Sequence, residues 1–171
     1  MADFDDFDVL KALSEDPDLR AGALMDLSPT IASELDARIS QINKDLQRVH
    51  LLAVSFADVF WEEVIDRRKA NEKGSDLGVR VRRRDSATEI SYYVNSYNVK
   101  KGSNSFLKGD YLRKSSANKY LERDFRKLYS WEKELIREME KSFSYCRSMS
   151  KALVASRASL KRCKSELGGI A

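Results

Sequence analysis

The chain has 171 residues, of which 34% are charged and 42% hydrophobic, and its formal net charge is +4. Seven glycines and two prolines are few, and this composition is typical of a mainly helical single domain. His50 and two cysteines are too few for a usual zinc site, and no run of about 18 apolar residues predicts a membrane span. We expect a cytoplasmic protein without metal or cofactor.

Residues 1–27 form an acidic N-terminal arm or short helix. The first 28 residues carry eight acidic side chains against two basic ones, and Phe4 and Phe7 stand among the acids. No apolar stretch resembles a signal peptide. The segment either packs its apolar residues on the body or binds, as an acidic–aromatic peptide, to a basic groove on a partner or on this protein. The basic remainder predicts a polyanionic partner.

The first long helix is predicted to begin at Ser28, an N-cap, followed by Pro29 in the first turn. Its apolar residues recur in alternating steps of four and three, as in a coiled-coil seam. That seam is Leu35, Ile39, Ile42, Leu46, Val49, Ala53, Phe56 and Phe60, widened by Leu52, Val59 and Val64. We expect the helix to end near Lys73 and Gly74.

A β-hairpin is predicted within residues 77–109. Apolar and polar residues alternate on both sides of a turn at Asp85, Ser86 and Ala87. Val79, Val81, Ile90, Tyr92 and Val94 would rest on the helices. The outer face would then carry Arg80, Arg82, Tyr93 and Tyr97.

The second long helix is predicted to start with Asp110 as N-cap and to stop at Gly168 and Gly169. Its seam reads Leu121, Phe125, Leu128, then Trp131 or Glu132, Leu135, Met139, Ser142, Cys146, Met149, Leu153, Ser156, Leu160, Cys163 and Leu167. Both cysteines would be buried free thiols. The predicted fold is mainly α, a long antiparallel helical hairpin or coiled coil with an inserted β-hairpin. Residues 28–171 would form one helical domain, able to dimerise into a four-helix arrangement.

Basic charge is concentrated in residues 77–127, which hold thirteen basic and five acidic side chains. Arginines on a β-ribbon suit a DNA groove, lysines suit phosphates, and the tyrosines could instead stack on unpaired bases. The predicted nucleic-acid-binding residues are Arg80, Arg82, Arg83, Arg84, Tyr93, Tyr97, Lys100, Lys101, Lys108, Arg113, Lys114 and Lys119. Alternatively, the arginines only protect an edge strand and the tyrosines are core.

Catalysis is not expected. A metal-dependent nicking enzyme that used Tyr92 or Tyr93 would need a histidine cluster for its cation, and the chain has one histidine. No glycine-rich phosphate loop is present.

The stretch EISYYVNSYNVKKGSNSFLKGDYLRKS, residues 89–115, resembles the auxiliary mobilization protein family of large conjugative plasmids and integrative elements. The resemblance implies a non-catalytic relaxosome component at an origin of transfer, which binds double-stranded DNA and recruits a relaxase or other partner.

Two other functions stay open. A structural or adaptor coiled coil, such as a secretion chaperone or phage assembly factor, would use the seam and not bind nucleic acid. A basic face on anionic lipid is disfavoured, because no apolar group stands free to insert.

Overall fold

The structure is a computed structural model, and it describes residues 17–84, 87–98, 106–116, 118–125 and 128–168. Of the predicted features, the acidic residues 1–16, Asp85 and Ser86 of the turn, and Lys100 and Lys101 lie outside the described residues. The elements in chain order are α2 (Pro17–Lys69), β1 (Leu77–Arg84), β2 (Ala87–Asn98), β3 (Phe106–Tyr111), the 3-10 turn η1 (Glu122–Asp124) and α3 (Ser130–Gly168).

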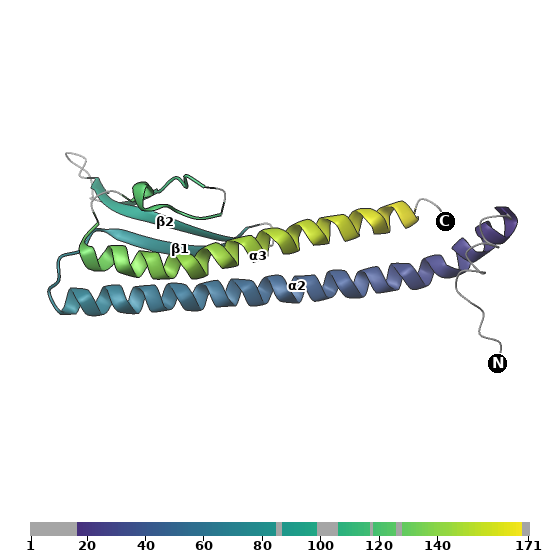
Figure 1. Cartoon of the computed structure of the whole chain (residues 1–171), viewed down its shortest axis with the longest axis horizontal. Helices are drawn as coiled ribbons and strands as arrows, with labels where there is room; N and C mark the ends of the chain where they lie inside the picture. Colours follow the sequence, from purple (N-terminus) through teal and green to yellow (C-terminus); the bar gives the residue numbers. More distant parts are fainter. Residues whose placement is uncertain (1–16, 85–86, 99–105, 117, 126–127, 169–171) are drawn as a thin grey trace. The chain divides into compact units, whose positions relative to one another are not determined.

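The two long helices α2 and α3 pack antiparallel, and the three strands are inserted between them in the sequence (Figure 1). The predicted mainly helical hairpin is thereby confirmed. The backbone divides into two units, Asn43–Ala155 and Met1–Ile42 with Ser156–Ala171. The first contains the whole sheet, and the second is a helical pair in which Lys164 of α3 forms an ion pair with Asp36 of α2.

The start of α2 was predicted wrongly. The helix begins at Pro17 and continues through Pro29 instead of starting there. The residues before Ser28 include alanine, leucine and methionine, which are strong helix formers, so the helix extends past the local start signal.

The end of α2 lies close to the predicted position, but Asn71 and not Gly74 provides the stop. Asn71 adopts the left-handed backbone, with φ 59°. Its N–H bonds to the carbonyl of Arg68, and the N–H of Glu72 bonds to that of Arg67, both at 3.0 Å. These two bonds satisfy carbonyls that the helix end leaves open.

Helix α3 begins at Ser130, so the predicted start at Asp110 was wrong. Asp110 lies in β3. Leu121, Phe125 and Leu128 continue the helical spacing but lie in the connection before α3. Glu132 marks the true start, because its carboxylate accepts the N–H of Tyr129 at 2.9 Å.

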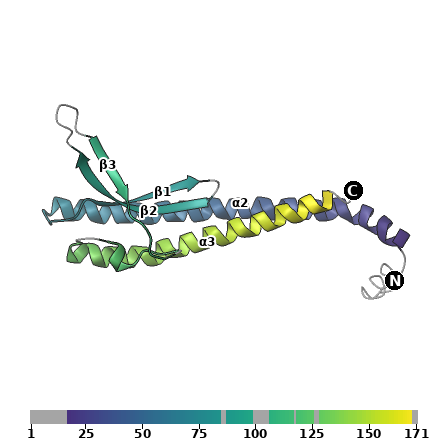
Figure 2. The same cartoon turned by 90° about the horizontal axis from the view of Figure 1, so that it is seen from above.

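The sheet is antiparallel, with strand order β1-β2-β3. The predicted hairpin is confirmed, with Val79 opposite Tyr92 and Val81 opposite Ile90. The third strand was not predicted; it pairs with the end of β2 from Tyr93 to Asn98, beyond most of the part that pairs with β1 (Figure 2). Tyr111 of β3 lies opposite Tyr93.

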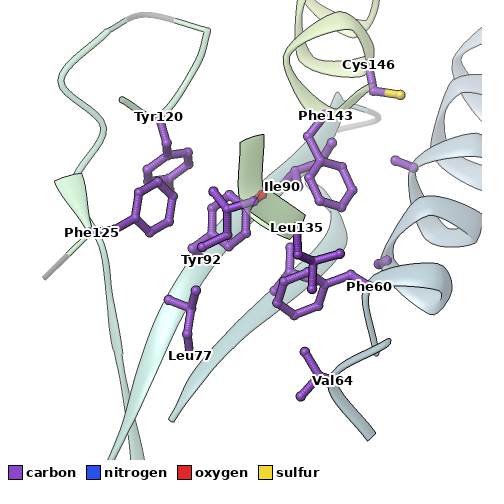
Figure 3. Packing of buried hydrophobic residues seen from close by; sticks show 14 of the residues in the cluster. Phe60, Val64, Leu77, Ile90, Tyr92, Tyr120, Phe125, Leu135, Phe143 and Cys146 are labelled. Carbon is purple, nitrogen blue, oxygen red and sulfur yellow. The ribbon is translucent and has the colours of Figure 1, made fainter. Parts of the chain in front are cut away.

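The core of the Asn43–Ala155 unit is centred on the fully buried Tyr92, on the inner face of the sheet (Figure 3). Its ring lies 6.2 Å from that of Phe60 in α2 and 6.0 Å from that of Phe143 in α3. The ring centres of Tyr120 and Phe125 each lie 5.1 Å from that of Tyr92, on another side of it. Edge-to-face contacts of this kind stabilise more than their buried area alone.

The predicted seam on α2 is correct at Leu46, Val49, Ala53 and Phe60, which are buried, whereas Leu52 and Val59 are exposed. The predicted seam on α3 is correct at Leu135, Met139, Cys146 and Leu153 and wrong by one residue at two positions. The inward positions are Phe143 and Ser150 instead of Ser142 and Met149, because α3 faces the sheet as well as α2. Cys146 is buried as expected, but Cys163 is exposed.

Candidate nucleic-acid interface

The outer face of the sheet combines arginine and tyrosine side chains from all three strands. Arg80 of β1 donates to the Tyr111 hydroxyl of β3 at 2.8 Å. The Arg82 guanidinium lies 5.6 Å from the centre of the Tyr111 ring, within cation–π range. Tyr111 is 46% exposed and organises this face, although the sequence analysis did not select it. Its ring lies 6.0 Å from that of Tyr93.

Tyr93 is half-buried on this outer face, over two glycines. A Cβ atom on Gly78 would come within 2.6 Å of the Tyr93 ring, and one on Gly109 within 3.2 Å. A side chain at position 78 would therefore clash with the Tyr93 ring, and one at position 109 would press against it. Arg80, Tyr93, Asn95, Gly109 and Tyr111 line a shallow cavity of about 350 Å³.

The end of the β1–β2 hairpin concentrates positive charge around one carboxylate. Arg82 donates to both oxygens of Glu89, at 2.8 and 3.1 Å. This hydrogen bond lowers the pKa of Glu89, and the nearby charges of Arg84 and Lys114 lower it further. Arg83 and Arg84 are exposed at the end of the strand. Among Arg82, Arg83 and Arg84, Arg82 is thus the most constrained.

The remaining predicted cations are distributed unevenly. Arg113 is exposed, and half-buried Lys114 lies 5.9 Å from the centre of the Tyr120 ring. Burial lowers the pKa of Lys114, and the Arg147 charge lowers it as well. Lys119 lines a different cavity, beside Tyr120 and Phe125.

Tyr97 and Lys108 are described by their backbone pairing only. Tyr97 pairs with Leu107 and Lys108 with Ser96 in the β2–β3 ladder. Their side chains, like Lys100 and Lys101 as a whole, lie outside what the structure describes.

A buried ion pair that the sequence analysis missed supports the segment after β3. Glu140 and Arg147 are almost fully buried and lie 2.7 Å apart. The Glu140 carboxylate also accepts the N–H of Tyr120 at 2.6 Å, and Arg147 donates to the carbonyl of Asn118 at 3.1 Å. Burial raises the pKa of Glu140, and the Arg147 charge opposes this rise. The spacing of seven residues on one helix was the only available signal.

Two chemical possibilities find no support in the part of the chain that is described. Within it, no three side chains among His, Cys, Asp and Glu gather as ligands for a metal ion. None of the described helices combines the length and apolarity needed to cross a membrane. What the outer face and hairpin end offer is a set of guanidinium donors beside an aromatic ring, a chemistry suited to phosphates and bases.

The fold and these residues define an antiparallel helical hairpin protein with a basic, tyrosine-bearing sheet inserted between its helices. A family model described as MobI protein matches residues 49–161, a range that includes the whole sheet. This match covers more than half of the chain, so the protein belongs to the MobI protein family, a mobilization protein family. Membership suggests a role in plasmid mobilization. No curated protein and no solved structure matches the chain.

Proposed function

We propose that this protein is a non-catalytic accessory of mobilization, which binds DNA at an origin of transfer and recruits a relaxase or another partner. DNA would contact the outer face of the sheet and the end of the β1–β2 hairpin. The observation that carries the proposal is that Arg80 and Arg82 meet at Tyr111, and that Arg84 lies near the Glu89 carboxylate that Arg82 binds, all within the family-matched region. The predicted cytoplasmic location is consistent with such a role.

Phosphate contact is the first contribution we assign. Arg83 and Arg84 are exposed at the strand end, where they can donate to phosphate oxygens without breaking an ion pair that the structure shows. Arg82 must first exchange its bond to Glu89 for one to phosphate. We therefore assign the larger share of binding to Arg83 and Arg84.

Double-stranded DNA suits this surface better than unpaired bases. Tyr93, which would be needed for stacking, is packed over Gly78 and Gly109 and is only half exposed. Tyr111 is the only exposed tyrosine among those whose side chains are described on this face, and the Arg82 guanidinium already lies over its ring. A continuous stacking platform of several rings is therefore missing from the described part of the sheet.

Mobility shifts with duplex DNA over a salt series test the proposal. Replacing Arg83 and Arg84 by alanine should weaken binding at low salt and reduce the slope of log affinity against log salt by about 2, one unit for each lost phosphate contact. The matched control replaces Lys161 and Arg162, two exposed cations on α3, by alanine. An unchanged slope in this control is expected.

Two results would overturn the proposal. If the wild-type protein does not shift duplex DNA at low salt, the proposal fails. The alternative adaptor function, which needs no nucleic acid, then takes its place. Equal losses in the R83A/R84A and K161A/R162A variants would mean that DNA senses only the net charge. Recruitment is tested separately, by asking whether a purified relaxase is retained on origin DNA only when this protein is present.

A further inference from the structure

An apolar groove with a basic rim lies apart from the outer face of the sheet. It has a volume of about 330 Å³ and belongs to the Asn43–Ala155 unit. Its floor is made by Tyr120, Phe125 and Leu128 from the connection before α3 and by Ile136 from α3 itself. A concave apolar site of this size can enclose one or two bulky side chains of a ligand.

The rim of the groove is positively charged. Lys119, Lys133, Arg137 and Lys141 line it and are exposed. The only exposed carboxylate among the described lining residues is Glu122, which lies 3.8 Å from Lys133. The other acid of the lining, Glu140, is neutralised by Arg147. The groove therefore favours an anionic ligand that also carries apolar side chains.

The groove is built in advance of any ligand. The N–H of Tyr120 is held by Glu140 at 2.6 Å, and the N–H of Leu121 by Asp124 at 2.9 Å. The Tyr120 and Phe125 rings pack on each other and on Tyr92 of the core. A rigid site loses less conformational entropy when a ligand binds.

We propose that this groove binds residues 3–10 of a second copy of this protein, so that two copies exchange acidic segments. The segment reads DFDDFDVL, with four aspartates around Phe4 and Phe7. Its phenylalanines match the apolar floor and its aspartates match the basic rim. Two copies can satisfy each other reciprocally, as a closed two-fold dimer requires. The proposal gives the predicted homodimer a chemical basis and does not depend on DNA binding.

A labelled peptide of residues 1–16 provides the first test, by fluorescence anisotropy. The receptor is the full chain carrying F4A and F7A, which removes its own competing anchors. We expect saturable binding of the wild-type peptide. A peptide that carries F7A should bind about tenfold more weakly, since one partly buried phenylalanine is lost. Equal binding of a peptide with serine at both phenylalanines would show that the groove reads charge alone and would overturn the proposal.

The rim is tested by charge reversal in the receptor. R137E with K141E should weaken peptide binding by more than tenfold, whereas the matched pair K161E and R162E, on an exposed part of α3, should not. Amide NMR signals of residues 119–122 and of Ile136 should shift on titration, and those of Tyr93 and Tyr111 should not. Shifts confined to the outer sheet face would contradict the proposed location.

The second copy is tested by sedimentation of the full-length protein. Wild-type protein should form a concentration-dependent dimer that F4A with F7A dissociates. Wild-type protein that stays monomeric would overturn the exchange between copies. The groove variant R137E with K141E should retain duplex DNA binding, and R83A with R84A should retain peptide binding. Failure of the DNA proposal and failure of the groove proposal are therefore distinguishable.

Discussion

Two arginine–glutamate pairs in the same unit differ in their burial and in the arrangement of their hydrogen bonds. Arg147 contacts both oxygens of Glu140 at 2.7 and 2.8 Å, and Arg82 contacts both oxygens of Glu89 at 2.8 and 3.1 Å. The side chains of the first pair are 5% and 9% exposed, and those of the second 43% and 33%. Burial and the further hydrogen-bond partners of each pair therefore separate their roles.

The buried pair acts as an anchor, because its remaining polar contacts go to the backbone. Tyr120 donates to Glu140, and Asn118 accepts from Arg147, so the segment after β3 is attached to α3 at two points. The exposed pair has no such backbone bonds among those described, and solvent screens it. It can exchange partners when a phosphate approaches, which the buried pair cannot do without losing the groove beside it.

Breaking the buried pair should have the largest effect. Replacing Arg147 by alanine leaves the Glu140 carboxylate buried without a cation, which typically destabilises a fold by about 3–5 kcal/mol. Chemical denaturation measures the free energy of unfolding. Replacing both residues by methionine should cost less than R147A alone, because no unpaired charge remains. A loss below about 1 kcal/mol in R147A would show that solvent reaches the site.

Breaking the exposed pair should change DNA affinity more than stability. Glu89→Gln removes a negative charge from among Arg82, Arg84 and Lys114 and releases Arg82 for phosphate. We expect duplex DNA to bind several-fold more tightly, with a salt slope steeper by about 1. The control is Glu62→Gln, on an exposed part of α2, which should leave both unchanged. Weaker binding in E89Q would mean that Glu89 positions Arg82 for DNA.

The helices and the hairpin could be predicted from sequence, because apolar residues recur with periods of 3.6 and 2 over long stretches. The third strand could not, since FLKGDY is short and contains a glycine. The start of α3 was hidden because Leu121, Phe125 and Leu128 keep the helical spacing while folding as a connection. Only tertiary packing, such as that of the Phe125 ring on Tyr92, distinguishes the two cases.

The candidate site was only partly predictable for a related reason. Exposed arginines are visible as a cluster in the sequence, so Arg83 and Arg84 were selected correctly as surface residues. Tyr111 contributes through a strand pairing that the sequence did not reveal. Glu140 and Arg147 look like an ordinary solvated helix pair, and their burial depends on where the segment before α3 lies. Tertiary placement, and not residue type, decides each of these cases.

The smallest expected effect is a difference between the two arginine–glutamate pairs in how their contribution to folding stability depends on pH. The pKa of Glu89 is lowered in the folded protein, so its contribution to stability is present above the pKa of an unfolded glutamate and is lost as pH falls through the lowered value. The stability difference between wild type and E89Q should therefore shrink on acidification from about pH 6 to about pH 3. Denaturation at a series of pH values measures it.

The buried pair should respond with the opposite sign. Burial raises the pKa of Glu140, so the protonated carboxyl is favoured by folding, and this contribution is lost as pH rises from the unfolded pKa through the raised value. In the same titration, R147A removes the cation that opposes the rise, so its deficit relative to wild type should be smallest in acid and grow toward neutral pH. A deficit independent of pH would mean that R147A acts through lost packing and the bond to Asn118, and not through the Glu140 charge.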